Sequence, residues 1–187
     1  MTARRFMVLF DRFPIQEDQV KAGNNIHEVI VASRCVNVAL FVSGDLRRNV
    51  SLGIAWGETR DLRVITFPGE SLKRVSPDER SISFFLLKSA NKADGLSYGQ
   101  GIVMDNGIEV KRTGFEILLE DWSPSSVYAA QKGAKDSEEA INRKEGVFVY
   151  GMGIHENPKA STQITALPRP PNPERFILDI NLKADRE

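Results

Sequence analysis

Four short stretches of the chain are apolar without a clean alternation of apolar and polar positions. They are FMVLF, VSLGIAW, RVITF and GVFVYGM, at residues 6–10, 50–56, 63–67 and 146–152. Such runs are typical of strands that are buried on both faces, and parallel pairing is the usual reason for that burial. We therefore expect four central strands, paired in parallel.

Apolar residues at helical spacing predict helices between these strands. The segment 26–43 is apolar nearly all round, which predicts a helix in the core or in a subunit interface, and Gly44 would end it. The segment from Ser76 to about Lys92 is amphipathic. Strand and helix alternate over most of the chain, which predicts an α/β fold.

Local capping and turn signals predict the shorter elements. Thr113 as a cap, with Glu116 three residues on, predicts a helix over residues 114–122, and another helix is expected near residues 137–144. The pair Asn106-Gly107 between two extended segments predicts a hairpin over residues 101–112.

The end of the chain is rich in proline before it resumes a helical pattern. Five of its prolines fall between residues 158 and 173. Asn172 as the cap and Pro173 as the first helical residue predict a last helix that starts there.

Composition and charge limit the kinds of site that the chain can carry. Its 187 residues are 41% hydrophobic, which is enough for one substantial core, so we expect a single domain over residues 1–187. Because 25 basic residues balance 25 acidic ones, any nucleic-acid surface must be a local patch. The lone Cys35 excludes an internal disulfide, and two histidines, His27 and His155, argue against a metal site.

The same counts predict where the protein works. A single cysteine indicates a reducing compartment, and no apolar stretch approaches the roughly 20 residues that a membrane span needs. We expect a soluble, cytoplasmic protein without a membrane partner.

The stretch VSPDERS, residues 75–81, has the composition of a helix start. Ser76 as the cap, Pro77 in the first helical position and Glu79 as its capping-box partner account for most of it. They do not account for Arg80, because a cation in the first turn opposes the helix dipole. An anion such as phosphate at this helix end would explain the arginine.

A second group of cations lies in SGDLRRNV, residues 43–50. Arg47 and Arg48 either occupy a solvated turn or, with Lys73, Arg74 and Arg80, form a basic rim of the kind that follows a phosphate backbone. Lys111 and Arg112 would extend that rim.

Four of these stretches together resemble a known family. DLRRNV (45–50), GESLKRVSPDERS (69–81), NGIEVKRTGF (106–115) and VFVYG (147–151) are similar, in this order, to the archaeal tRNA pseudouridine-54 N1-methyltransferases of the SPOUT superfamily. The resemblance implies an α/β fold with a parallel sheet, a C-terminal trefoil knot that holds S-adenosylmethionine, and a homodimer. It also implies transfer of a methyl group to N1 of a pseudouridine in the TΨC arm of tRNA.

The resemblance implies three groups of site residues. N1 must lose a proton as the methyl group arrives, so a nearby charge or base and accurate placement would carry most of the rate. The catalytic candidates are Asp45, Arg48 and Arg80, although Asp45 is as well explained by capping or by pairing with Arg48. The RNA-binding candidates are Arg47, Lys73, Arg74, Lys111 and Arg112, and the cofactor-binding candidates are Tyr150, Gly151, Leu167, Pro168 and Phe176.

The chain departs from the family pattern at the cofactor end, residues 153–187. Met152 and Gly153 stand where the family has an Asp-His pair, Leu167 stands in a glycine position, and Phe176 in the position of a small residue. An Arg-x-Asp element is also absent from the first long helix, where His27 and Glu28 either replace it or mark the helix start.

Two functional interpretations follow from these departures. One is an RNA methyltransferase with a shortened knot that holds the donor by backbone groups. The other is a non-catalytic SPOUT relative that keeps the dimer face and an RNA surface, since a leucine side chain would crowd a close backbone approach. A metabolic enzyme on an open sheet would need a glycine-rich phosphate loop or a nucleophile elbow, and the sequence has neither.

Overall fold

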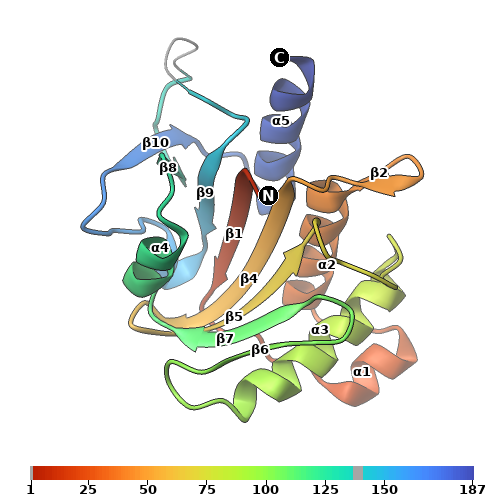
Figure 1. Cartoon of the computed structure of the whole chain (residues 1–187). Helices are drawn as coiled ribbons and strands as arrows, with labels where there is room; N and C mark the ends of the chain where they lie inside the picture. The colour runs from red at the N-terminus through yellow and green to blue at the C-terminus, as the bar shows by residue number, and fades with distance from the viewer. Residues whose placement is uncertain (1, 137–140) are drawn as a thin grey trace.

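The computed structural model describes residues 2–136 and 141–187, which form a mixed sheet flanked by helices (Figure 1). The sheet has eight strands in the order β10-β8-β9-β1-β4-β5-β7-β6. Its strands are β1 (Arg4–Phe10), β4 (Val50–Glu58), β5 (Asp61–Pro68), β6 (Gly101–Val103), β7 (Glu109–Thr113), β8 (Val127–Gln131), β9 (Gly146–Gly151) and β10 (Ile164–Pro168).

The helices and a small hairpin complete the chain. The helices are α1 (Glu17–Ala22), α2 (His27–Leu40), α3 (Glu79–Asp94), α4 (Phe115–Trp122) and α5 (Pro173–Arg186), with a 3₁₀ turn, η1, at Gly153–His155. Strands β2 (Phe41–Val42) and β3 (Asp45–Leu46) pair with each other outside the main sheet. The predicted α/β fold is confirmed.

All four predicted central strands are present, but their directions differ from the expectation. Strands β10, β8, β9, β1 and β4 run parallel, whereas β5 pairs antiparallel with β4 through a tight turn after Glu58. The expected parallel pairing of RVITF is therefore wrong. This strand has apolar residues on both faces because Ile65 and Phe67 belong to the core on one side of the sheet, while Leu62 and Val64 belong to the core on the other.

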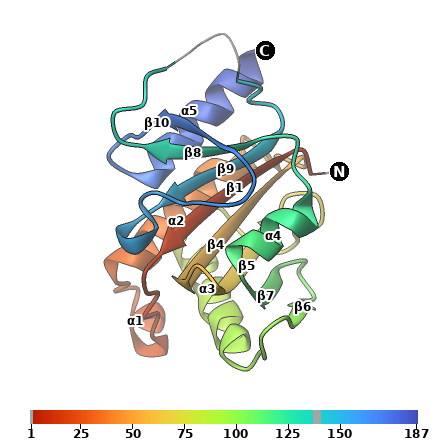
Figure 2. The same ribbon diagram turned by 90° about the vertical axis from the view of Figure 1, so that its left-hand side faces the viewer.

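The two faces of the sheet are covered by different helices. Phe6 and Val8 of β1 pack into the larger core, which includes residues of α2, α3 and α5. Met7 and Leu9 point to the opposite face and pack with α4. Figure 2 shows the resulting layers, with α4 on one side of the sheet and α2 on the other.

Two predicted helix ends are wrong, each because another group makes the cap. Helix α2 ends at Leu40, and Gly44, with a φ of 79°, lies in the β2–β3 turn instead of ending the helix. Helix α3 begins at Glu79, and the side chain of Asp78, not that of Ser76, accepts a hydrogen bond from the Ser81 amide at 2.8 Å.

The remaining local predictions have mixed outcomes. Gly114, not Thr113, precedes α4. The hairpin at Asn106-Gly107 is confirmed, and so is the start of α5, where Asn172 accepts from the Arg175 amide at 3.0 Å. Of the helix expected near residues 137–144, residues 137–140 lie outside the described residues, and residues 141–144 are not helical.

The C-terminal segment returns across the sheet before it ends. Strand β10 pairs with β8 and not with its predecessor β9, and α5 then packs against α2. Asn181 of α5 donates to the carbonyls of Val38 and Ala39 at 3.0 and 3.2 Å. The trefoil knot stays a prediction, since strand pairing alone does not establish threading.

Candidate functional site

Three neighbouring parallel strands, β8, β9 and β10, bring most of the predicted cofactor residues to their carboxyl ends. Tyr150 and Gly151 end β9, and Leu167 and Pro168 end β10. Phe176 lies one turn into α5, which follows directly. In parallel sheets with helices on both faces, ligands bind beyond the carboxyl ends of the strands, so a cofactor site is expected at this edge.

A cavity of about 250 Å³ lies between β10, α5 and the segment that joins β8 to β9. Leu167, Pro168 and Phe176 line it, as the sequence predicted, whereas Tyr150 and Gly151 do not. The other lining residues are Asp136, Arg143, Arg169, Pro170, Asp179, Ile180 and Lys183. The cavity therefore combines an apolar wall with charged groups at its rim.

Tyr150 does not line the cavity itself, but it contacts Arg169 and Pro170, which do. Its hydroxyl donates to the Pro170 carbonyl at 2.7 Å, and the Arg169 guanidinium lies 4.0 Å from its ring centroid. Burial raises the pKa of Tyr150, so the hydroxyl keeps the proton that it donates. Tyr150 thus fixes the position of the Arg169–Pro170 loop.

Arg169 is a residue that the sequence analysis missed. Its Nη1 is buried, lies in a side chain that lines the cavity, and has no hydrogen-bond partner among the described residues. A buried guanidinium nitrogen without an acceptor is costly, and a bound anionic group would remove that cost. The only signal in the sequence was an isolated cation between two prolines, in PRP at residues 168–170.

Gly151 is needed for packing, since a side chain there would collide with the carbonyl of His155. The turn after it, η1, is tied to the ends of two other strands. The Asp11 carboxylate fills the space beside Gly153 and accepts from the Ile154 amide at 2.7 Å, and His155 Nε2 lies 2.7 Å from the Gly57 carbonyl. The turn that stands in place of the family's Asp-His pair is therefore held by contacts with Asp11 and Gly57.

The predicted catalytic residues do not form one cluster within the chain. Asp45 and Arg48 lie together, 3.4 Å apart, and the same Asp45 oxygen accepts from the Leu46 amide. Arg80 lies elsewhere, in a cleft between α1 and α3 that Lys21 also lines. This pairing of Asp45 with Arg48 was the alternative that the sequence left open.

Asp45 and Arg48 also lie away from the predicted cofactor residues at the ends of β9 and β10. They precede the amino end of β4, whereas the cofactor residues follow the carboxyl ends of β9 and β10. Because β4, β1 and β9 are parallel neighbours, these two groups occupy opposite edges of the sheet. Within one chain, the length of these strands therefore separates Asp45 from the predicted cofactor residues that end β9 and β10.

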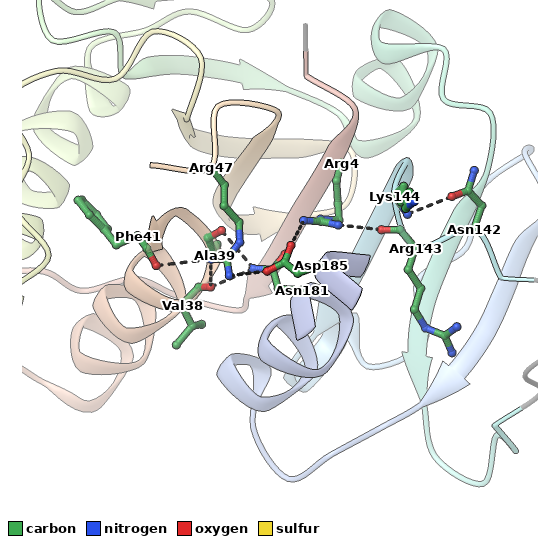
Figure 3. Close-up of polar contacts among 10 residues, drawn as sticks. All are labelled: Arg4, Val38, Ala39, Phe41, Arg47, Asn142, Arg143, Lys144, Asn181 and Asp185. Atoms are coloured by element: carbon green, nitrogen blue, oxygen red, sulfur yellow. Dashed lines mark hydrogen bonds and ion pairs between the residues drawn. The ribbon is translucent and has the colours of Figure 1, made fainter. Parts of the chain in front are cut away.

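Arg47 points inward and joins three segments (Figure 3). It donates to the carbonyls of Val38 and Phe41 at 3.4 Å each and pairs with Asp185 of α5 at 2.9 Å. Asp185 also lies 3.7 Å from Arg4, a buried residue whose Nη1 donates to the Arg143 carbonyl at 3.1 Å. Burial lowers the pKa of Arg4 while Asp185 opposes that change.

The remaining predicted RNA-binding residues divide into paired and unpaired cations. Lys111 pairs with Asp121 at 2.8 Å, and Arg112 bonds both oxygens of Asp61, at 2.9 and 2.8 Å. Within residues 2–136 and 141–187, Lys73 and Arg74 make no ion pair, and both side chains are exposed. His27 and Glu28 are the first two residues of α2, so they mark a helix start as one interpretation held.

No group of histidine, cysteine and acidic residues able to hold a metal ion occurs in the part of the chain that the structure describes. Over the same residues, none of the helices has the length and hydrophobicity needed to cross a membrane.

Comparison with known proteins identifies the family to which the chain belongs. A family model described as "Putative SAM-dependent RNA methyltransferase" matches residues 18–168, which is most of the chain. The chain belongs to this family. The match to the RNA methyltransferase family ends with β10, so it includes Tyr150, Gly151, Leu167 and Pro168 but not Phe176.

Several curated proteins that share the name tRNA (pseudouridine(54)-N(1))-methyltransferase are similar to the chain. One from Methanococcus aeolicus is 34% identical over 134 residues, which are 66% of this chain and 64% of that protein. One from Methanococcus maripaludis is 45% identical over 125 residues, or 65% of this chain and 62% of that protein. One from Methanococcoides burtonii is 26% identical over 168 residues, or 83% and 82%. The chain thus spans slightly less than two thirds of the first relatives, and the family expected from the sequence is confirmed.

Proposed function

We propose that the protein is an S-adenosylmethionine-dependent methyltransferase that modifies N1 of a pseudouridine in the TΨC arm of tRNA, at position 54. The family match and the names of the similar archaeal proteins support the reaction. The observation that carries the proposal for this chain is the cavity beside β10 and α5, with an unpartnered buried nitrogen of Arg169 in its lining.

The residues around the cavity fit the donor in its main chemical parts. Leu167 and Phe176 offer an apolar wall for the adenine ring, and Arg169 offers a cation for the carboxylate of the amino-acid part. When bound, S-adenosylmethionine supplies a methyl group attached to a positively charged sulfur. The loop Arg169–Pro170, held by Tyr150, would orient the donor and keep water away from it.

A homodimer is part of the same proposal. Asp45 and Arg48 lie at the opposite edge of the sheet from Tyr150, Gly151, Leu167 and Pro168, so a donor held by those residues would meet them only across two chains. In such a pair, Asp45 would hold or accept the proton that leaves N1, and Arg48 would hold an RNA phosphate. Sedimentation velocity should show a species of twice the monomer mass.

The RNA surface is proposed to follow the unpaired cations Lys73, Arg74 and Arg80. Arg47, Lys111 and Arg112 were predicted to join it, and each already bonds a carboxylate of the chain. Replacing Arg80 by glutamine should weaken tRNA binding and reduce the slope of log Kd against log salt by about 0.7–0.9. An unchanged slope would remove Arg80 from the surface.

We further propose that residues 1–187 fold as one SPOUT-like domain with the knot expected of it, and that the protein works in the cytoplasm beside its tRNA. One sheet contains strands from both halves of the chain, which supports the single domain.

The deciding experiment has a binding arm and a transfer arm. Calorimetric titration should show S-adenosylmethionine binding at micromolar concentration. Labelled methyl groups should then pass to a tRNA that carries pseudouridine at position 54, and not to the same transcript with uridine there, because uridine is joined to its ribose through N1. A flat titration at millimolar donor would instead identify the non-catalytic relative.

A further inference from the structure

A cavity of about 550 Å³ lies between α3 and the β6–β7 hairpin. Strands β6 and β7 form the edge of the sheet farthest from β10, so this groove is separate from the donor site (Figure 1). Of its lining residues, only Arg74 belongs to the RNA surface proposed above. We refer to it as the α3–β6 groove.

The groove has exposed apolar side chains on both of its walls. Phe84 on α3 is 53% exposed and Val103 on β6 is 72% exposed. Phe84 packs edge-to-face against Phe85, with ring centroids 5.2 Å apart, which fixes its ring. Single exposed apolar residues are common, but two that line one groove mark a surface for a ligand or partner.

The charges around the groove are mostly positive. Arg74, Lys88 and Lys92 line it, against the single acid Asp105. Among residues 2–136 and 141–187, none of these three cations takes part in an ion pair, so each is available to a ligand.

These cations continue the surface that begins at Arg80. Arg80, Phe84, Lys88 and Lys92 are four residues apart and therefore form one row along α3, with about 6 Å of helix axis between neighbours. The row places one aromatic ring between phosphate-binding groups. That arrangement is typical of surfaces that bind single-stranded nucleic acid by stacking and charge.

Asn106 adds an independent indication of a ligand. It lines the groove and is 4% exposed, and its Nδ2 has no hydrogen-bond partner among the described residues. Its Oδ1 is taken by the Ile108 amide at 3.2 Å, and its carbonyl accepts from the Lys73 amide at 2.9 Å, so the residue is fixed. The wall of the groove therefore contains a fixed, buried amide donor that lacks an acceptor among the described residues.

Arg74 is held in an unusual backbone conformation at the edge of the same groove. Its φ is 61°, in the left-handed region that residues other than glycine rarely occupy. Such conformations concentrate at ligand-binding sites, where the surrounding structure maintains them.

We propose that the α3–β6 groove binds one unpaired nucleotide of the substrate RNA, away from the nucleotide that is methylated. The base stacks on Phe84, an acceptor on its edge receives a hydrogen bond from Asn106 Nδ2, and neighbouring phosphates lie against Arg74, Lys88 and Lys92. The inference rests on the proposed function in taking RNA as the substrate, but it does not depend on the methyl donor.

The test measures binding of a short single-stranded RNA that contains 2-aminopurine, whose fluorescence falls when it stacks. With the full-length protein, fluorescence should fall on binding. Phe84→Ala should abolish that change and weaken binding by roughly 5- to 150-fold without altering the salt slope. Phe84→Tyr should keep both the affinity and the fluorescence change.

The charged residues are tested in a second pair of variants. Lys88→Gln/Lys92→Gln should keep the fluorescence change but reduce the salt slope by about 1.4, which corresponds to two phosphate contacts on a single strand. Lys135→Gln/Lys144→Gln removes two exposed lysines outside the groove and should leave the slope unchanged. Circular dichroism checks that each variant is folded.

Three results would overturn the inference. One is an unchanged affinity and fluorescence signal in Phe84→Ala, and another is an equal loss of slope in both lysine pairs. The third is a Phe84→Ala variant that loses self-association in sedimentation while it binds RNA normally, since the groove would then be an interface between two copies. Methyl transfer measured in parallel distinguishes these failures from failure of the proposed function, because transfer can persist without the groove.

Discussion

Arg169 should determine how tightly the protein holds the carboxylate of the methyl donor. Its guanidinium lies over the Tyr150 ring, and its buried Nη1 lacks a partner among the described residues. A hydrogen bond from a charged donor to a carboxylate contributes about 1.5–3 kcal/mol. Arg169→Gln should therefore raise the Kd for S-adenosylmethionine by roughly 10- to 150-fold.

The assay is calorimetric titration with two ligands. 5′-Methylthioadenosine has the adenosine and the methyl-bearing sulfur of the donor but lacks its carboxylate, so its affinity should change by less than about twofold, or 0.4 kcal/mol. Arg186→Gln, which removes an exposed arginine near the end of α5, should change neither affinity. The bond from Tyr150 to the Pro170 carbonyl does not involve Arg169 and should keep the loop in place.

Two outcomes would refute the assignment of Arg169. Equal weakening of both ligands would mean that the variant disturbs the cavity as a whole and that the guanidinium does not bind the carboxylate. An unchanged Kd for S-adenosylmethionine would mean that the donor does not contact Arg169. Thermal unfolding of Arg169→Gln, compared with Arg169→Lys, separates lost packing on Tyr150 from lost ligand contact.

Two further predictions concern stability. Gly153→Ala should destabilise the fold by about 2–3 kcal/mol in urea titrations, because the φ of Gly153 is 57° and a methyl group there would displace the Asp11 carboxylate. The control Gly133→Ala, at a φ of 77° with open space around it, should cost only about 1 kcal/mol. Equal losses in the two variants would contradict the role of Asp11. The hydrogen bond from Arg112 holds the pKa of Asp61 below the ordinary value of 3.8, so the pair stabilises the fold above that pH and its contribution is lost as the pH falls through the lowered pKa. Asp61→Asn should therefore be less stable than the wild type at pH 7, with a difference that shrinks toward pH 2, and a difference independent of pH would contradict the pairing.

The central strands could be predicted from the sequence because burial on both faces leaves a continuous apolar run. The direction of β5 could not, since two-sided burial arises equally from parallel pairing and from helices on each side of an antiparallel strand. The start of α3 was ambiguous for a related reason: Ser76 and Asp78 are both good capping residues, and only the folded backbone decides between them.

The site was harder to predict than the fold. A sequence shows where cations are but not whether a carboxylate meets them. The partners of Arg47 and Arg112 lie 138 and 51 residues away, so their pairing appears only in three dimensions. The row of residues along α3 beside the α3–β6 groove does have a signal in the sequence, namely the four-residue spacing of Arg80, Phe84, Lys88 and Lys92.

The attachment of α5 has a consequence for when the cavity beside it forms during folding. Asn181 and Asp185 hold this helix to residues that lie 143 and 138 positions earlier in the chain. Contacts that close such long loops are slow to form during folding, because the chain must lose much entropy before they become favourable. Docking of α5 is therefore expected to be a late step. Since α5 carries Phe176 to its place in the cavity wall, a nascent or partly folded chain would lack that wall of the proposed donor site, and the proposed methyl transfer would begin only when folding is complete.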